Sequence, residues 1–357
     1  MADYKNIFEL VKHFKDRSKN LASRSPGILK NLKKLKFRLG EFYWADDSDA
    51  LSPDLEWVNC GKDFPSGKLV LMETSAGLFR GQTDAYSPCY PRAFRDFPLV
   101  RRPRELSEEY RVKFLASQAK TLWYIFLLHK HPAVHRARSL NIKMSSGVIA
   151  QHYGMSTPYL DLTQSIEIAS FFACCEYRDN EWQPRSTGKG VIYLFSSISD
   201  AGLIGLVTFP RPVLQKAQFV FLPFGVDFEK LPQVKKFVFN HTLEGARHYL
   251  ELFNSGKDLF PEDPAEDIAK DIVASGSIPK DFVVDALLRF GCIPENLEKT
   301  LSIFKDNLNK YCNLTVGDNV PIEFTDDHIK RAGDALAKHA KRFDDFKGWV
   351  RPVRVSR

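Results

Sequence analysis

The segment YLDLTQSIEIASFFACCEY, residues 159–177, carries the clearest local fold signal in this chain of 357 amino acids. Its first five residues, 159–163, are expected to be extended. After them, apolar side chains recur at helical spacing, at Ile168, Phe171, Phe172 and Cys175. Thr163 or Ser165 can cap this helix, and Glu167 complements its positive end. The segment therefore predicts a strand, a turn and a helix that pack together.

Further strands and helices are expected on both sides of this unit. Segments rich in β-branched and aromatic residues, bounded by Gly, Pro or polar clusters, are 68–72, 77–81, 190–195, 218–222 and 235–239. Segments with helical periodicity are 106–130, 243–253, 264–274, 282–290, 294–311 and 326–343. We therefore expect an α+β fold, in which a small mixed or antiparallel sheet forms the core and helices flank it.

Changes of composition divide the chain into three parts. Residues 1–68 are expected to form a basic helical region, residues 69–275 to hold the sheet, and residues 276–357 to form a second basic helical region. The turn-like stretch 277–279 is the candidate boundary between the last two parts.

Bulk composition is that of a globular protein. Hydrophobic residues make up 44% of the chain and aromatic residues 13%, which is enough for real cores. The start of the chain has no apolar segment, and the longest apolar run, 122–128, is far shorter than the roughly 20 residues that span a bilayer. We therefore expect no membrane contact and a cytoplasmic location.

The cysteines give no indication of a metal site. None of the six lies in a C-x-x-C pair or has a histidine at ligand spacing, so no metal is expected. The adjacent Cys174 and Cys175 fall in an apolar helical stretch and are expected to be buried, inert thiols.

The net charge of +7 is concentrated at the two ends of the chain. Residues 12–38 and 330–357 are both crowded with Lys and Arg. Such ends can contact nucleic acid or an acidic protein, because neutralising phosphate needs no sequence-specific geometry. The alternative is that they are ordinary solvated helix faces.

Several separated motifs occur in a fixed order. They are Phe79-Arg80-Gly81-Gln82, the segment 151–163 (QHYGMSTPYLDLT), Arg211 followed by 215–219 (QKAQF), and 259–263 (LFPED). In this order they resemble the FRG-domain family of bacterial proteins, whose members share a Phe/Tyr-Arg-Gly motif and a His-x-Gly-x-x-Thr-x-x-Leu-Asp-x-Thr segment. The chain departs from the family pattern at Leu162, where an aromatic is usual, and at Ala217, which replaces glycine. The resemblance implies that residues 69–275 form an FRG domain.

A more distant resemblance is to the ADP-ribosyltransferases. The arginine-type branch of that fold has an Arg at the end of its first core strand, a Ser/Thr-x-Ser/Thr strand before a helix, and a later Glu or Gln. The corresponding order here is Arg80, then Thr163-Gln164-Ser165, then Gln215 or Gln218. This likeness implies an ADP-ribosyltransferase-like fold. It also implies that the cofactor NAD is consumed as a substrate, with its nicotinamide bond cleaved.

The resemblance gives the candidate site residues their roles. The candidate catalytic residues are Arg80, Thr163, Gln215 and His152. The candidate NAD-binding residues are Arg80, Gly81, Gln82, Asp161 and Ser165. An arginine fork can hold two phosphate oxygens, and the flanking glycine lacks a Cβ that would keep a ligand from the backbone. Hydroxyls and a helix N-terminus suit an anionic ligand, and a histidine can move a proton near neutral pH.

Each of these residues also has a structural alternative. Arg80 can pair with Asp161 or Asp84, and Thr163 and Ser165 can act only as helix caps. His152 can be an ordinary loop histidine. The amide of Gln215 can hydrogen-bond to a ribose hydroxyl, but it cannot act as a base.

Three functions therefore stay open at this point. The first is a transferase that moves ADP-ribose from NAD to a protein or nucleic acid, or an NAD glycohydrolase. The second is a non-catalytic nucleotide sensor, and the third is a nucleic-acid-binding module. Transferase chemistry requires Arg80, Thr163 or Ser165, and Gln215 or His152 to converge on one cleft.

Overall fold

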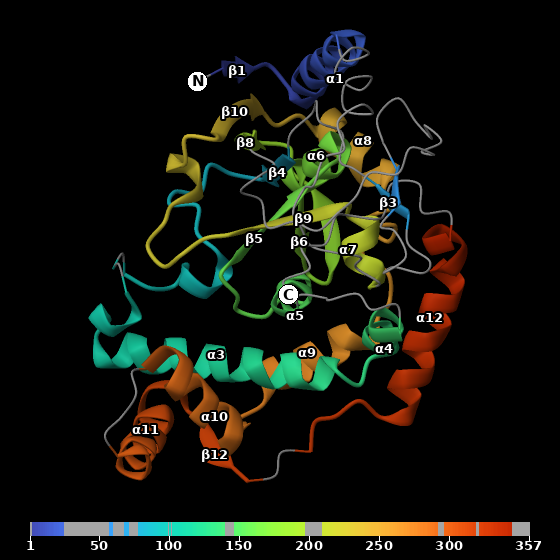
Figure 1. The fold of residues 1–357 in the computed structure, drawn as a ribbon. Coiled ribbons are helices and arrows are strands. Elements are labelled where there is room, and N and C mark those ends of the chain that lie inside the picture. Colours follow the sequence, from blue (N-terminus) through green and yellow to red (C-terminus); the bar gives the residue numbers. More distant parts are fainter. Residues whose placement is uncertain are drawn as a thin grey trace.

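The computed structural model describes residues 2–24, 57–59, 68–70, 78–98, 100, 102–139, 146–196, 209–291, 296–318 and 321–344. Within these ranges the protein is a mixed α/β fold, in which a central sheet of six strands lies among helices (Figure 1). The expected combination of a small sheet and flanking helices is confirmed.

The central sheet has the strand order β1-β10-β8-β4-β5-β9. Its strands are β1 (Ala2–Tyr4), β4 (Leu78–Gln82), β5 (Tyr159–Thr163), β8 (Lys189–Phe195), β9 (Ala217–Phe221) and β10 (Val234–Asn240). Strand β1 runs parallel to β10, and the other neighbours are antiparallel, so the sheet is mixed. Five of these strands lie where the sequence predicts them. The edge strand β1 is an addition that its three residues do not reveal.

One predicted strand lies outside the central sheet. Strand β3 (Lys68–Val70) pairs instead with β2 (Trp57–Asn59), as an antiparallel pair. A further pair, β11 (Ser277–Pro279) with β12 (Thr315–Gly317), is parallel and brings the start of the C-terminal region beside a later segment.

The helices expected from periodicity are present, and shorter ones join them. They are α1 (Ile7–Arg24), α3 (Glu108–Leu128), α4 (Pro132–Ser139), α5 (Ser146–His152), α6 (Ile166–Cys174), α7 (Pro210–Leu214), α8 (Leu243–Leu252), α9 (Pro264–Ala274), α10 (Lys280–Ala286), α11 (Leu297–Cys312) and α12 (Asp326–Asp344). The N-cap of α6 is Ser165, whose Oγ accepts a hydrogen bond from the Ile168 amide. This is one of the two caps that the sequence offers.

Helix α6 is shorter than the periodicity predicts. It ends at Cys174, and residues 175–177 belong to strand β6 (Cys175–Arg178), which forms a hairpin with β7 (Glu181–Pro184). The two residues of the turn, Asp179 and Asn180, both have positive φ, at 51° and 64°. Asp and Asn tolerate this conformation and are favoured in two-residue hairpin turns. The turn therefore decides against a longer helix.

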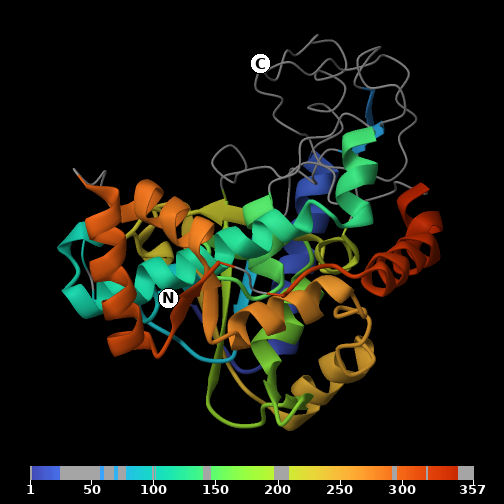
Figure 2. The ribbon, with the colours of Figure 1, turned by 90° about the horizontal axis from the view of Figure 1, so that it is seen from below.

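Helix α3 connects the sheet to the C-terminal helices. Figures 1 and 2 show it as a long helix below the sheet, with α9 beside one half and α10 and α11 beside the other. The N-terminal half packs in one core cluster with Val283 and Leu308, and the C-terminal half packs in another with Ile268 and Ile272. Side chains from both sides of residue 275 therefore share cores, and the expected boundary at that point stays a prediction.

Candidate functional site

The centre of the sheet is split between β4 and β5. These strands share a single registered pair, Phe79 with Thr163, whereas β4 and β8 share five pairs and β5 and β9 share five. Beyond that pair, Arg80 Nη1 donates a 2.9 Å hydrogen bond to the main-chain oxygen of Asp161. A side chain thus bridges the two strands where the backbone ladder ends.

The alternation of strand β4 decides which of its side chains reach the split. Phe79 belongs to the core cluster that contains α6, and a Cβ added to Gly81 would lie 1.8 Å from the Ala169 carbonyl oxygen of that helix. Arg80 and Gln82 therefore point to the opposite face, because successive residues of a strand alternate. Gly81 lines the cleft, but its missing Cβ is required by helix packing, not by the approach of a ligand.

A cleft of about 750 Å³ lies over this split. Its lining residues come from β4, the loop after it, α5, β5, α6, the β6–β7 hairpin and the start of β9. Of the residues predicted from sequence, those that line it are Arg80, Gly81, Gln82, His152, Asp161, Thr163 and Gln215. The convergence that transferase chemistry requires is thus present in the geometry. Ser165 is not among the lining residues of the described part.

Three arginines meet at one end of the cleft. Arg92 and Arg95 come from the short helix Arg92–Phe94 and the residue after it, and they join Arg80. The pKa of Arg95 is lowered, first by desolvation against the walls of the cleft and then by repulsion from the Arg80 guanidinium. Within the described ranges, none of the three forms an ion pair with a carboxylate. The nearby Asp161 carboxylate offsets part of this repulsion, but the three arginines outnumber it, and an excess of positive charge at one place favours an anion.

Three polar atoms in the cleft walls are buried and have no hydrogen-bond partner among the described residues. They are Arg80 Nε, Gln82 Oε1 and Asp161 Oδ1. A buried polar atom that is left unpaired costs about 1–3 kcal/mol, so native structures rarely keep several at one place without a reason. Because these atoms have almost no accessible surface, a polar ligand would satisfy them only after their side chains turn toward the cleft.

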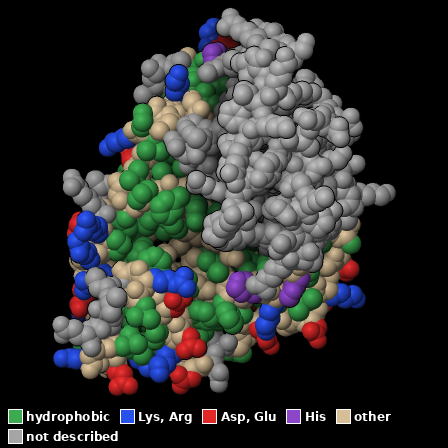
Figure 3. All heavy atoms as spheres, viewed as in Figure 1, with side chains coloured by type: hydrophobic (Ala, Val, Ile, Leu, Met, Phe, Trp, Pro, Cys, Tyr) green, Lys and Arg blue, Asp and Glu red, His purple; other side chains and the backbone are tan. Residues whose placement is uncertain are grey.

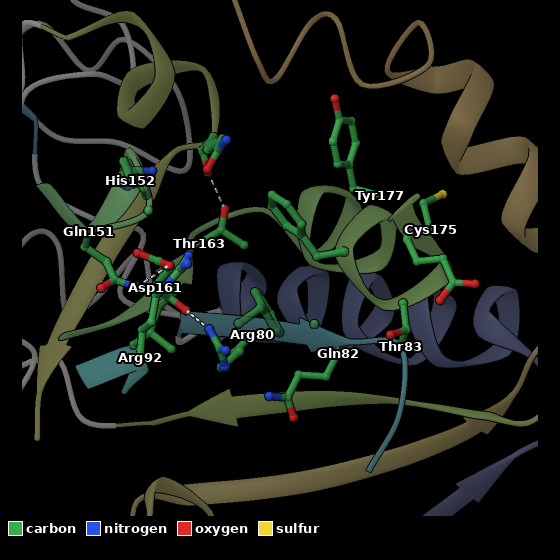
Figure 4. Close-up of a pocket in the computed structure, with 18 of the residues that line it drawn as sticks. Arg80, Gln82, Thr83, Arg92, Gln151, His152, Asp161, Thr163, Cys175 and Tyr177 are labelled. Carbon is green, nitrogen blue, oxygen red and sulfur yellow. Dashed lines mark hydrogen bonds between the residues drawn. The ribbon is translucent and has the colours of Figure 1, made fainter. Parts of the chain in front are cut away.

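The carboxylate of Asp161 is held from one side only. Thr157 Oγ1 donates to Gln151 Oε1 at 2.6 Å, and Gln151 Nε2 donates to Asp161 Oδ2 at 3.2 Å. This relay fixes the side chain and leaves Oδ1 without a partner among the described residues (Figure 4). The structural alternative, an ion pair of Arg80 with the carboxylate of Asp161 or Asp84, is not formed, because the guanidinium uses the Asp161 main-chain oxygen and Asp84 pairs with Arg185.

The other predicted residues are already engaged within the protein. Thr163 Oγ1 donates to the Gln215 main-chain oxygen at 2.8 Å and accepts from the Ser165 amide. Gln215 is 6% exposed, and its Nε2 donates to the Leu259 carbonyl at 3.0 Å. Ser165 Oγ donates to Glu167 as well as capping α6. These contacts tie β5, α6 and α7 together beside the cleft.

His152 closes the end of α5 at the cleft wall. Its ring packs edge-on against Phe219, with ring centroids 4.8 Å apart, and its main-chain oxygen accepts a hydrogen bond from Arg211. His152 is therefore the last residue of a helix, and it lines the cleft.

The residues that sequence reasoning missed come mainly from loops and from the hairpin. They include Arg92, Arg95, Tyr177 and Trp182. The pair of arginines three residues apart, in the segment Pro91-Arg-Ala-Phe-Arg95, was the available signal. Nothing local shows that this segment folds back onto β4.

The thiols near the site are inert, as expected. Cys174 and Cys175 are both buried, and burial raises the pKa of Cys175, which lines the cleft, to about 12. A protonated thiol is a poor nucleophile. In the described residues no group of His, Cys, Asp and Glu has the arrangement of a metal site.

The fold and the cleft define a mixed α/β protein with a basic, ligand-sized cleft across a split sheet. The family model of the FRG domain matches residues 75–181, which include the motifs at 79–82 and 151–163, whereas the motifs at 211–219 and 259–263 lie outside the match. The match covers β4, α3, β5, α6 and the first strand of the hairpin, and the cleft extends beyond it to Gln215 and Phe260. Neither the curated proteins nor the solved structures contain a match.

The basic ends are described only in part. Lys15 of α1 forms an ion pair with Glu167, and Arg331 of α12 pairs with Asp267. On the face drawn in Figure 3, acidic and basic side chains are interspersed along the lower edge. Residues 25–38 and 345–357 lie outside the described residues. No described helix is both long enough and apolar enough to cross a membrane.

Proposed function

We propose that the cleft binds a nucleotide through its phosphates, and that NAD is the first candidate. The observation that carries this proposal is the cluster of Arg80, Arg92 and Arg95, which outnumbers the one nearby carboxylate, Asp161, and forms no ion pair with a carboxylate in the described ranges. Guanidinium groups bind phosphate oxygens in pairs, and such charge-assisted bonds are roughly twice as strong as neutral ones.

The size and polarity of the cleft support a ligand larger than a simple anion. A volume of about 750 Å³ is within the usual range for sites that hold small organic ligands. The unpartnered Gln82 Oε1 and Asp161 Oδ1 are acceptors, which suits hydroxyl or amine donors such as those of ribose or a base. Phosphate alone would leave them unsatisfied.

The test is isothermal titration of NAD into the wild-type chain and into Arg80→Ala. We expect binding to weaken about 10-fold or more in the variant, because hydrogen bonds to charged groups are worth about 1.5–3 kcal/mol. Arg289→Ala is the matched control, since that arginine is exposed and pairs with Asp285 on its own helix. Equal affinity of all three proteins for NAD, or no affinity in any of them, would contradict the proposal.

A second candidate function is cleavage of NAD, as in an ADP-ribosyltransferase-like enzyme or an NAD glycohydrolase. In that reaction the bond between ribose C1′ and nicotinamide breaks, nicotinamide leaves with the electron pair, and an acceptor or water adds to C1′. The observation that favours it is the fixed carboxylate of Asp161, whose Oδ1 has no partner among the described residues. A carboxylate there can align ribose hydroxyls and stabilise the positive charge of the transition state.

In this second function the catalytic carboxylate is that of Asp161, and Gln215 does not take this role. The Gln215 side-chain amide donates to the Leu259 carbonyl, so that side chain stabilises the fold. Incubation with NAD labelled in the nicotinamide tests the idea. Nicotinamide release by the wild type that is lost in Asp161→Asn, with NAD binding retained, is the expected result. Binding without release would leave the nucleotide sensor as the function.

Binding of a nucleic acid or an acidic protein through the basic ends is a separate proposal. It rests on the Lys- and Arg-rich sequences at 12–38 and 330–357. Such binding should weaken steeply with salt and should be unaffected by Arg80→Ala, which distinguishes it from binding in the cleft.

A further inference from the structure

The end of the cleft away from the arginines is aromatic. Trp182 of the β6–β7 hairpin packs against Phe260 and Phe172, with ring centroids 5.0 and 6.1 Å apart, and all three residues line the cleft. Tyr177 lies directly opposite Trp182 in the hairpin register, and their ring centroids are 5.4 Å apart. One wall of a polar cleft is therefore built from ring faces and edges.

Tyr177 differs from the other three rings in its exposure. Its side chain is 59% exposed although it lines the cleft, whereas Trp182, Phe172 and Phe260 are half-buried in the core cluster behind it. Figure 4 shows the Tyr177 ring on the opposite side of the cleft from Arg92, with no other labelled side chain against it. A large aromatic ring that lines a cleft and is still largely exposed can stack against a flat ring of a ligand.

The hairpin that carries Tyr177 is anchored at several points. Glu176 is close to both Arg178 and Arg185, and Arg185 also pairs with Asp84 of the loop after β4. Trp182 packs tightly against Gly256, where a Cβ would lie 2.4 Å from the indole. Because both sides of the hairpin are fixed, the tyrosine ring is held in position before a ligand arrives, which lowers the entropic cost of binding.

We propose that the aromatic end binds a flat heterocyclic ring of the ligand, stacked on Tyr177, while the arginine end holds the phosphates of the same molecule. This inference rests on the proposed nucleotide function and specifies which part of the molecule each end recognises. Thr83 also lines the cleft, and its hydroxyl offers an acceptor for the sugar that joins phosphate to ring. The ligand class is therefore a nucleotide, whose heterocyclic base or nicotinamide ring stacks on Tyr177, and not a sugar phosphate or an inorganic phosphate.

The experiment compares four probes on five proteins. The probes are NAD, ADP-ribose, which lacks nicotinamide, inorganic pyrophosphate, which lacks both rings, and a single-stranded oligonucleotide. The proteins are the wild type, Arg80→Ala, Tyr177→Ala, Tyr177→Phe and Phe221→Ala, and Phe221 is a similarly exposed aromatic on β9 that is not among the cleft's lining residues. Affinities are measured by titration at one fixed salt concentration.

We expect Tyr177→Ala to bind NAD about 5- to 150-fold more weakly, which is the range for loss of one ring-on-aromatic stack. Its affinity for pyrophosphate should be unchanged, and Tyr177→Phe should bind NAD within about 3-fold of the wild type, since the ring is kept. If ADP-ribose affinity is also lost in Tyr177→Ala, the stacked ring is adenine. If Tyr177→Ala keeps the wild-type affinity for ADP-ribose but binds NAD no more tightly than ADP-ribose, the ring is nicotinamide.

Several outcomes would overturn the inference. Equal NAD affinity in Tyr177→Ala and Phe221→Ala would do so, and so would a wild type that binds pyrophosphate as tightly as NAD. In both cases the phosphate-binding proposal survives if Arg80→Ala still weakens pyrophosphate binding, and it fails if Arg80→Ala has no effect. A single-stranded oligonucleotide that binds the cleft more tightly than NAD, with the same dependence on Tyr177, would replace the small ligand by a nucleic acid.

Discussion

Two arginines of the protein, the half-buried Arg80 and the buried Arg211, have surroundings that differ sharply. Arg211 pairs with Glu266, donates to the His152 carbonyl and has its guanidinium 4.9 Å from the Tyr153 ring and 5.2 Å from the Phe260 ring. Arg80 makes one hydrogen bond, to a main-chain oxygen, and faces two further arginines. Both belong to motifs of the FRG resemblance, so sequence alone does not separate their tasks.

The same contrast holds for two aspartates. Asp263 accepts hydrogen bonds from Tyr153 and the Ala265 amide and contacts His131 at 3.3 Å, while Asp161 has an oxygen without a partner among the described residues. A polar cluster that satisfies itself stabilises a fold, whereas one that is left unsatisfied at a cleft awaits a ligand. The predictions below test whether this distinction holds.

The largest effect is expected at Gly81. In the Phe79-Arg80-Gly81 motif this glycine serves helix packing, whereas Arg80 faces the ligand cleft. A Cβ at this position would meet the backbone of α6, which cannot move aside as a side chain can. Gly81→Ala should lower the free energy of unfolding by about 3 kcal/mol or more. Gly276→Ala is the control, because a Cβ there has no atom within 4 Å. Equal urea midpoints for the two variants would show that the glycine serves something other than packing.

An effect of similar size is expected for Asp263. Asp263→Ala should destabilise the protein by about 3–5 kcal/mol, because it leaves the buried His131 and Tyr153 without their partner. Asp161→Ala should cost about 1–3 kcal/mol, since only Gln151 loses a partner among the described residues. Chemical denaturation of both variants measures the difference. The distinction between the two clusters would be wrong if Asp161→Ala were the more damaging change.

The pH dependence of stability should also come from the satisfied cluster. Burial alone would raise the pKa of Asp263, but the hydrogen bond and charge of His131 and the bond from Tyr153 outweigh it, so the pKa lies below its ordinary value. A carboxyl whose pKa is lowered by folding stabilises the protein above the unfolded pKa of about 3.9 and loses that contribution as the pH falls through the lowered pKa. Unfolding free energies measured from pH 6 to pH 3 should therefore fall less in Asp263→Asn than in the wild type. Parallel curves would assign the acid sensitivity to other groups.

The smallest effect is expected at Thr163, where a residue of the cleft wall also holds the fold. Thr163→Val keeps the shape and removes the hydroxyl that bonds to Gln215 and Ser165. We expect a loss of about 1 kcal/mol in stability, as for one buried hydrogen bond, with NAD binding unchanged. A loss of NAD binding without a loss of stability would make Thr163 a ligand contact after all.

Much of the fold was predictable because its signals are local. The strands at β4, β5, β8, β9 and β10 are short β-branched and aromatic runs, and the cap of α6 is a single serine at the expected place. The hairpin at 175–184 was missed because the apolar periodicity of α6 continues to Tyr177, and the Asp179-Asn180 turn outweighs it. Strand β1 was missed because three residues carry no pattern.

The site was predictable where a motif marks it and not where tertiary folding assembles it. Arg80, Asp161, Thr163, Gln215 and His152 line one cleft, as the ordered motifs imply. The other lining residues could not be foreseen, because Arg92 and Arg95 reach the cleft through a loop and Tyr177 reaches it through the hairpin. Sequence spacing also gave no sign that Gly81 faces a helix backbone.

The central claim is that Arg80 serves a ligand and Arg211 serves the fold. Thermal unfolding of the wild type, Arg80→Ala and Arg211→Ala, each with and without NAD, tests it most directly, since a ligand that binds the folded state raises its melting temperature. We expect Arg80→Ala to melt within a few degrees of the wild type and to lose the shift caused by NAD, while Arg211→Ala melts much lower without ligand. An Arg80→Ala protein that is as unstable as Arg211→Ala, or that keeps the full shift with NAD, would contradict the claim.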